Sequence, residues 1–248
     1  MKLCRFETVA SPGQARSGIY FEGKVYETDG HRAIGVHAAQ DVRFLSPIAR
    51  PSSLRFAEPD SSTRPVAYVY GNPALVGAGQ STVELPEGGT GLRFVPQVAA
   101  VLETTGRELD IEEADQSVLG FLAAGFLTGT EARDARDWAI SVAATLATRD
   151  EFDDRSTPTE NGRRYHLHGV LSKNGEKVGE GSAIPKAATV AETVSACSQT
   201  GGVFSGDLIL LGPVLEQDSN MPLTVGVLPG DTVTFAVDLL GVLTVHFT

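Results

Sequence analysis

The sequence has little of the chemistry that marks zinc-binding, redox or membrane proteins. Its two cysteines, Cys4 and Cys197, match neither a zinc-site spacing nor a redox motif, so we expect two buried thiols that behave as small apolar residues. No apolar run is long enough to span a bilayer, and the polar residues that follow Met1 are unlike a secretory signal. We therefore expect a cytoplasmic protein without a structural zinc site.

Positive charge is also scarce. The chain has 20 Lys and Arg residues against 31 Asp and Glu residues, which gives a formal net charge of −11. An acidic surface repels phosphate backbones, and the sequence has no basic amphipathic stretch that would bind a membrane surface. Nucleic acid and membranes are therefore not expected as partners, and a small-molecule substrate is.

Turn-forming residues, by contrast, are frequent, with 27 Gly and 13 Pro among 248 residues. Together with many Val, Thr and Phe residues they favour short strands. Glu22-Gly23 and Asn174-Gly175 predict tight hairpins. Asp110 is able to cap a helix over 111–125, and a second helix is predicted over 190–198. Strands are predicted over 3–6, 16–21, 24–27, 67–70, 81–85, 94–102, 165–171, 177–181, 207–211, 231–237 and 242–246.

The chain divides in two by composition. Residues 50–65 are rich in Pro and Ser and predict a linker. We infer a β-rich α+β protein with a small N-terminal domain and linker over 1–65 and a larger C-terminal domain over 66–248.

Several short sequence motifs, called family phrases below, follow one another along the chain. They are MKLCRF at 1–6, LSPI at 45–48, VGAG at 76–79, VLGF at 118–121, NGE at 174–176, GDLILLGP at 206–213 and PGD at 229–231. In this order they resemble the fumarylacetoacetate hydrolase family. The resemblance implies a mixed β-sandwich roll behind a small N-terminal domain, assembled as a homodimer. It also implies Mg²⁺ or Mn²⁺ held by three carboxylates, with a 2-oxo acid or β-diketone substrate that passes through an enolate.

The carboxylates that the resemblance implies are absent. Val95 and Gln97 stand at the two positions of the first pair of ligands, in the buried strand over 94–102, and Phe126 stands at the third. Val and Phe offer no oxygen, and Gln offers one neutral carbonyl, whereas Mg²⁺ takes hard oxygen ligands. A shifted register would bring Glu131 to the third position and leave the first two vacant. We therefore expect no metal and no other cofactor.

Other implied parts of the site also differ. The lid region over 55–65 has no His, Asn72 and Asp134 stand in place of two lysines, and Leu211 replaces a threonine. The replacements are mostly apolar. Two alternatives follow: the site has collapsed, or it holds a larger apolar ligand.

Two groups of residues are candidates for the site. The first group would line the pocket and consists of Tyr70, Asn72, Val95, Gln97, Phe126 and Leu211. For the polar members of this group, ordinary strand packing is the alternative. The second is the charged segment over 131–137. There Arg133 or Arg136 could bind a substrate carboxylate, and Glu131 or Asp137 could act as general base. A solvated loop of mutual ion pairs is the alternative for this segment. We name Glu131, Arg133 and Asp137 as catalytic candidates.

Two histidines, His166 and His168, alternate on one face of a predicted strand, a spacing that can ligate a metal. No third ligand lies near them in sequence, so we expect surface or structural roles.

Three functions remain open. The first is a metal-independent lyase, isomerase or cyclase that promotes isomerisation, cyclisation, elimination or addition on an enolisable or polyunsaturated, largely apolar substrate, as secondary metabolism would use. The second is a non-catalytic relative of the same fold that binds a ligand or a dimer partner. The third is a Mg²⁺- or Mn²⁺-dependent acylpyruvate hydrolase or 2-oxo acid decarboxylase or tautomerase.

Overall fold

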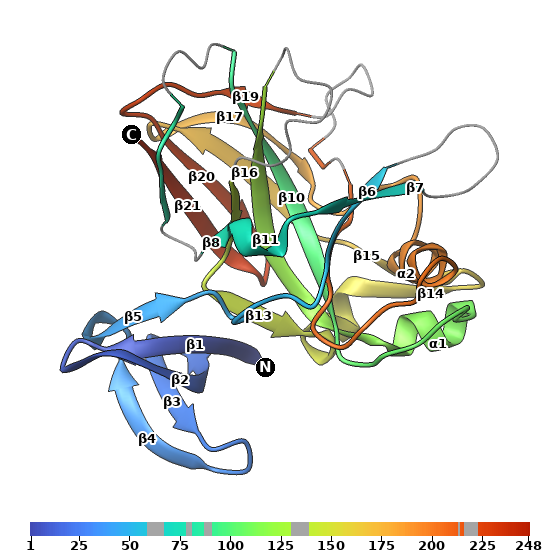
Figure 1. Ribbon diagram of the computed structural model, residues 1–248, viewed down its shortest axis with the longest axis horizontal. Helices are drawn as coiled ribbons and strands as arrows, with labels where there is room; N and C mark the ends of the chain where they lie inside the picture. Colours follow the sequence, from blue (N-terminus) through green and yellow to red (C-terminus); the bar gives the residue numbers. More distant parts are fainter. Residues whose placement is uncertain (59–66, 78–80, 87–90, 130–138, 213, 216–222) are drawn as a thin grey trace.

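The computed structural model describes residues 1–58, 67–77, 81–86, 91–129, 139–212, 214–215 and 223–248. These residues confirm a β-rich α+β fold, with strands in three sheets and two short α-helices at one end (Figure 1). None of the helices described is long and apolar enough to cross a membrane.

The N-terminal part of the chain is an antiparallel meander with a small core of its own. The hairpin predicted at Glu22-Gly23 is confirmed, because both residues have the positive φ that a tight turn requires, at 47° and 76°. The core of this part contains Cys4, Phe6 and Val25. Its elements are β1 (Lys2–Thr8), β2 (Ser11–Phe21), β3 (Lys24–Thr28), β4 (Ala33–Ala38), η1 (Ala39–Asp41) and β5 (Val42–Leu45).

The same sheet continues through β1 into the centre of the molecule. Its order is β4-β3-β2-β1-β13-β11-β10-β18-β6-β7. Strands β18 and β6 are parallel, and the other pairs along this path are antiparallel. The additional strands are β6 (Leu54–Glu58), β7 (Ala67–Gly71), β10 (Arg93–Leu102), β11 (Val118–Thr128), β13 (Thr145–Thr148) and β18 (Leu208–Leu210). The linker expected over 50–65 is therefore wrong for 54–58, because the β18 edge pairs with that segment.

A second sheet packs across the central strands and closes the larger core. Its order is β17-β16-β20-β21-β9. The hairpin at Asn174-Gly175 joins β16 and β17, as predicted, with both residues at positive φ. The strands are β9 (Ser81–Val83), β16 (His168–Lys173), β17 (Glu176–Ser182), β20 (Thr232–Val237) and β21 (Gly241–Phe247).

Short elements connect these sheets. The helix predicted over 190–198 is confirmed as α2 (Val190–Ser198), with a capping box between Thr189 and Glu192. The others are η2 (Pro73–Leu75), β8 (Val76–Gly77), α1 (Ile111–Gln116), β12 (Ile140–Val142), η3 (Arg149–Arg155), β14 (Ser156–Thr159), β15 (Gly162–Tyr165) and β19 (Val225–Gly226).

The helix predicted over 111–125 is mostly wrong. Asp110 does cap a helix and forms a capping box with Glu113, but α1 ends at Gln116. From Val118 onward the chain is the buried strand β11, which pairs with β10, β12 and β13. The apolar run 118–126 has no polar face for solvent, which suits a strand that is buried on both faces and paired on both edges.

Two glycines in β11 show how closely the central strands pack. A Cβ at Gly120 would lie 2.1 Å from the backbone oxygen of Ala147, and one at Gly125 would lie 2.1 Å from the ring of Phe94. Any larger residue at either position would therefore force the backbone or the ring to move.

Candidate functional site

The three positions at which the family resemblance implies metal ligands lie together in the structure. Val95 pairs directly with Phe126 across β10 and β11, and Gln97 pairs with Ala124. Since alternate residues of a strand point to one face, these side chains share one face of the sheet. These positions therefore meet on one face, although the first two and the third lie on different strands with a helix between them.

Apolar packing fills this position. Val95 and Phe126 belong to a buried cluster that includes Leu54 and Phe56 of β6 and Ile140 of β12. The rings of Phe56 and Phe126 meet edge to face, with centroids 5.1 Å apart. Leu75 and Val76 pack against the same cluster from η2 and β8. Within the part of the chain that the structure describes, the metal position is thus part of the core.

Gln97 is the polar member of the trio, and its carbonyl oxygen is already engaged. The backbone N–H of Gly212 donates to Oε1 of Gln97 over 2.9 Å. Gln97 is buried, and this bond satisfies its acceptor without a ligand. Its side chain therefore ties β10 to the segment after β18.

These residues do not fit Mg²⁺ or Mn²⁺. Two of the three side chains have no oxygen, and the third offers a neutral carbonyl that accepts a backbone hydrogen bond. In the described ranges, no group of three or more His, Cys, Asp or Glu side chains is placed to hold a metal ion.

The other predicted pocket residues are spread around this cluster. Tyr70 lies on the edge strand β7, largely exposed, and its ring stacks on Arg55. The Oδ1 atom of Asn72 accepts from the N–H of Ala74 and caps η2. Leu211 packs in the core on the other face of the sheet. The structure thus brings Val95, Gln97 and Phe126 together but not Tyr70 or Leu211.

The charged segment with Glu131, Arg133, Asp134, Arg136 and Asp137 lies outside the described residues, so these catalytic candidates stay predictions. Its two flanks are described. The N–H of Leu127 donates to the oxygen of Ala139 over 3.1 Å, next to the pair formed by Phe126 and Ile140. The described residues on either side of the segment therefore lie beside the apolar cluster.

The two cysteines are buried and the two histidines lie at the surface, as expected, but the single strand predicted to carry both histidines is wrong, because β15 ends at Tyr165 and β16 begins at His168. His166 and His168 are exposed; His166 meets the hydroxyl of Thr157 over 3.0 Å, and His168 lies 3.9 Å from Glu180. Burial raises the pKa of Cys4 to about 12 and that of Cys197 to about 11. Both thiols therefore stay protonated and unreactive at neutral pH.

Sequence reasoning missed a buried ion pair. Arg55 of β6 donates to the backbone oxygens of Cys197 and Gly202 over 2.6 and 2.5 Å, and its guanidinium lies 3.4 Å from the carboxylate of Asp207. Tyr68 and Tyr70 stack on this guanidinium at 5.3 and 5.0 Å. Asp207 follows Gly206 in one of the family phrases, but its partner lay in the expected linker. The pair holds the β6–β7 hairpin on α2 and β18.

A comparison with known families decides where this fold belongs. The model of the fumarylacetoacetate (FAA) hydrolase C-terminal domain matches residues 39–248. The chain belongs to the fumarylacetoacetate hydrolase family. None of the curated proteins matches its sequence.

Several solved structures have the same fold as this chain. The 2-hydroxyhepta-2,4-diene-1,7-dioate isomerase from Mycobacterium marinum is 17% identical with a TM-score of 0.82, over 100% of this chain and 98% of that one. The 5-carboxymethyl-2-hydroxymuconate delta-isomerase from Mycobacterium smegmatis is 16% identical, with a TM-score of 0.80 and coverage of 100% and 99%. A maleylpyruvate hydrolase from Sphingobium sp. SYK-6, in complex with manganese (II) ion and pyruvate, is 13% identical, with a TM-score of 0.79 and the same coverage.

Proposed function

We propose that this fumarylacetoacetate hydrolase family member is an enzyme that works without the metal implied for its relatives. It would promote isomerisation, cyclisation, elimination or addition on an enolisable or polyunsaturated, largely apolar small molecule, as a homodimer and in a biosynthetic setting such as secondary metabolism. The observation that carries the proposal is the exchange of all three implied ligand positions for Val95, Gln97 and Phe126 on an otherwise intact family fold.

The outer side of the apolar cluster is the place where such a substrate would lie. Val95 and Phe126 each keep 8% of their surface exposed, whereas Ala99 and Leu122, deeper on the same face, keep none. The first two side chains therefore form the outer wall of the cluster, and the metal position itself is filled. Apolar contact there would contribute about 25 cal/mol for each Å² buried.

Acid–base chemistry would come from the segment whose flanks lie beside this wall. Glu131 or Asp137 would take the proton, and Arg133 would hold an anionic end of the substrate. Catalysis would rest on positioning and on hydrogen bonds rather than on a Lewis acid.

A specific observation favours a second candidate, a non-catalytic member of the family. Phe126 is packed edge to face on Phe56, and the carbonyl of Gln97 already accepts from Gly212. A site that is already filled by the protein's own side chains needs no ligand.

One assay separates these candidates. The probe is benzoylacetone, an enolisable and largely apolar diketone. Its ultraviolet absorbance follows the conversion of the enol to the ketone in buffer that contains EDTA. The enzyme proposal expects a rate above that of buffer, lowered at least about tenfold by Asp137→Gln or Glu131→Gln. A rate equal to buffer, with no binding of the diketone, favours the non-catalytic candidate. Activity that appears only with Mg²⁺ or Mn²⁺ would restore the metal-dependent hydrolase hypothesis.

A further inference from the structure

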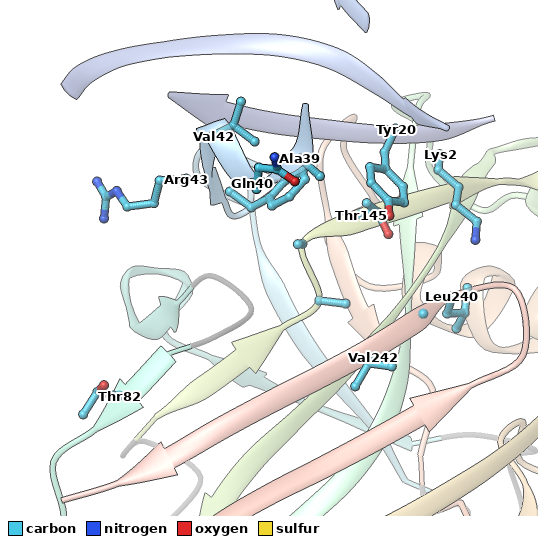
Figure 2. A pocket seen from close by; sticks show the side chains of 14 residues that line it. Lys2, Tyr20, Ala39, Gln40, Val42, Arg43, Thr82, Thr145, Leu240 and Val242 are labelled. Carbon is cyan, nitrogen blue, oxygen red and sulfur yellow. The ribbon is translucent and has the colours of Figure 1, made fainter. Parts of the chain in front are cut away.

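A cavity whose lining includes none of Val95, Gln97 and Phe126 lies in the cleft between the N-terminal meander and the second sheet (Figure 2). Its volume is about 940 Å³, within the range of about 300–1,000 Å³ typical of small-molecule sites. Its walls come from β1, β2, η1, β5 and the start of β13 on one side, and from β9, β21 and the turn between β20 and β21 on the other.

The charge of this cavity is opposite to that of the protein. Fourteen residues line it, and they include Lys2 and Arg43 but neither Asp nor Glu. This composition contrasts with a chain whose net charge is −11. Arg43 points away from the cavity in Figure 2, and its Nε donates to Glu7 over 2.5 Å. The cationic group that remains for a ligand is the ammonium of Lys2.

The ammonium group of Lys2 makes no hydrogen bond or ion pair with any other residue in the described ranges. The same holds for the hydroxyls of Tyr20 and Thr145. In the antiparallel pair of β1 and β2, Leu3 lies opposite Ile19. Lys2, one residue before Leu3, therefore lies beside Tyr20, one residue after Ile19. Lys2 also pairs with Ala147, which shares a face with Thr145, so all three side chains lie on one face of the sheet. Three polar groups thus meet at one end of the cavity without a partner among the described residues.

The opposite wall is apolar. Leu240 and Val242 lie on the opposite side of the cleft from Lys2 and Tyr20 in Figure 2; 56% of Val242 is exposed, whereas Leu240 is buried in the core. On the near side the ring of Tyr20 meets Phe44 edge to face, with centroids 5.9 Å apart. This arrangement places a cation and two hydroxyls beside apolar side chains.

We infer that this cleft binds a small organic monoanion with a hydrocarbon body. Its carboxylate accepts hydrogen bonds from the ammonium of Lys2 and the hydroxyl of Tyr20, and its hydrocarbon part lies between Phe44 and Val242. One uncommitted ammonium suits one negative charge, whereas a polyphosphate needs several cations or a glycine-rich loop, and neither lines this cleft. The inference concerns a separate place from the Val95–Phe126 cluster and does not rest on the proposed function.

The probe is hexanoate, compared with hexylammonium, in an NMR titration of the full chain with no residues added before Met1. We expect the amide signals of Thr145 and Val242 to shift and saturate with hexanoate. Hexylammonium should bind at least about tenfold more weakly, because Lys2 repels its ammonium group and attracts the carboxylate of hexanoate. Equal binding of the two probes, or shifts confined to other parts of the chain, overturns the inference.

Matched variants test the residues. Lys2→Met should weaken hexanoate binding about tenfold, and Lys2→Arg should keep most of it. Lys24→Met is the control, because it removes the same charge from an exposed position on β3. Val242→Glu should abolish binding while leaving the melting temperature near that of wild type, because the side chain is exposed. Unchanged affinity in Lys2→Met or in Val242→Glu contradicts the inference.

Discussion

Replacing Phe126 by alanine tests directly whether the metal position is packed core. Phe126 keeps 8% of its surface exposed and meets the ring of Phe56 at 5.1 Å. It is also flanked by Val95 on β10 and Ile140 on β12, its direct partners in the sheet. Alanine would remove the whole ring from this cluster.

The expected loss follows from this packing. Phe-to-Ala changes in buried sites lower the free energy of unfolding by about 3–5 kcal/mol, which includes the cavity left behind. The residual exposure of Phe126 places it near the lower end of this range, and the aromatic pair with Phe56 supplies about 0.5–1.5 kcal/mol of the total. We therefore expect a loss of about 3 kcal/mol.

Urea unfolding followed by far-ultraviolet circular dichroism measures this loss. The midpoint should fall while the slope with urea stays unchanged, because the same surface is exposed on unfolding. Phe21→Ala is the matched control, since 57% of Phe21 is exposed, and it should change stability by less than about 0.5 kcal/mol. Benzene, which fits an apolar cavity left by an aromatic ring, should raise the midpoint of Phe126→Ala but not that of wild type.

A loss below about 1 kcal/mol for Phe126→Ala would refute this reasoning. It would mean that the ring borders open space instead of packed side chains. That outcome would weaken the non-catalytic candidate and favour a substrate cavity at the metal position itself.

Three further predictions concern charge and metal. Arg55→Met should lower the free energy of unfolding by about 3–5 kcal/mol, because it leaves the buried carboxylate of Asp207 without a cation. Hydrogen bonds from Arg43 and from the N–H of Gly13 lower the pKa of Glu7, so its stabilisation is present above its unfolded pKa of about 4.3 and is lost as pH falls through the lower folded value. The melting temperature should not change when 1 mM Mn²⁺ is added. A Mn²⁺ site of micromolar affinity would instead raise the free energy of unfolding by about 4 kcal/mol.

Each of these has its own check in unfolding experiments. Arg55→Met with Asp207→Asn should lose less than the sum of the two single changes, and full additivity would mean that the pair does not interact. The stability difference between wild type and Glu7→Gln should shrink as pH falls below about 4.3, and a constant difference would contradict the linkage. A clear rise in melting temperature with Mn²⁺ would contradict the interpretation of Val95, Gln97 and Phe126.

Local features of the sequence predicted the local features of the fold. Glu22-Gly23 and Asn174-Gly175 form hairpins because positive φ at adjacent residues is a property of those residues themselves. The continuous apolar run of β10 likewise indicated a strand buried on both faces. Ordered family phrases carried the remaining information, because they align Val95, Gln97 and Phe126 with positions that meet on one face.

Partners distant in sequence decided the rest. Residues 118–125 have good helix-forming composition in part, yet pairing with β10, β12 and β13 makes them a strand. The strand over 54–58 exists because the edge of β18, far along the chain, offers it hydrogen bonds. No periodicity in either segment reports such a neighbour.

The sequence by itself thus determined the family and the class of fold, and it placed Val95, Gln97 and Phe126 where the resemblance implies carboxylates, because these depend on which residues are present and in what order. Tertiary structure alone decided that Phe126 meets Phe56, that Arg55 is buried against Asp207, and that Lys2 and Tyr20 lie across a cleft from Val242. These contacts join residues from separate strands, and only the register and packing of the sheets bring their side chains within reach of one another.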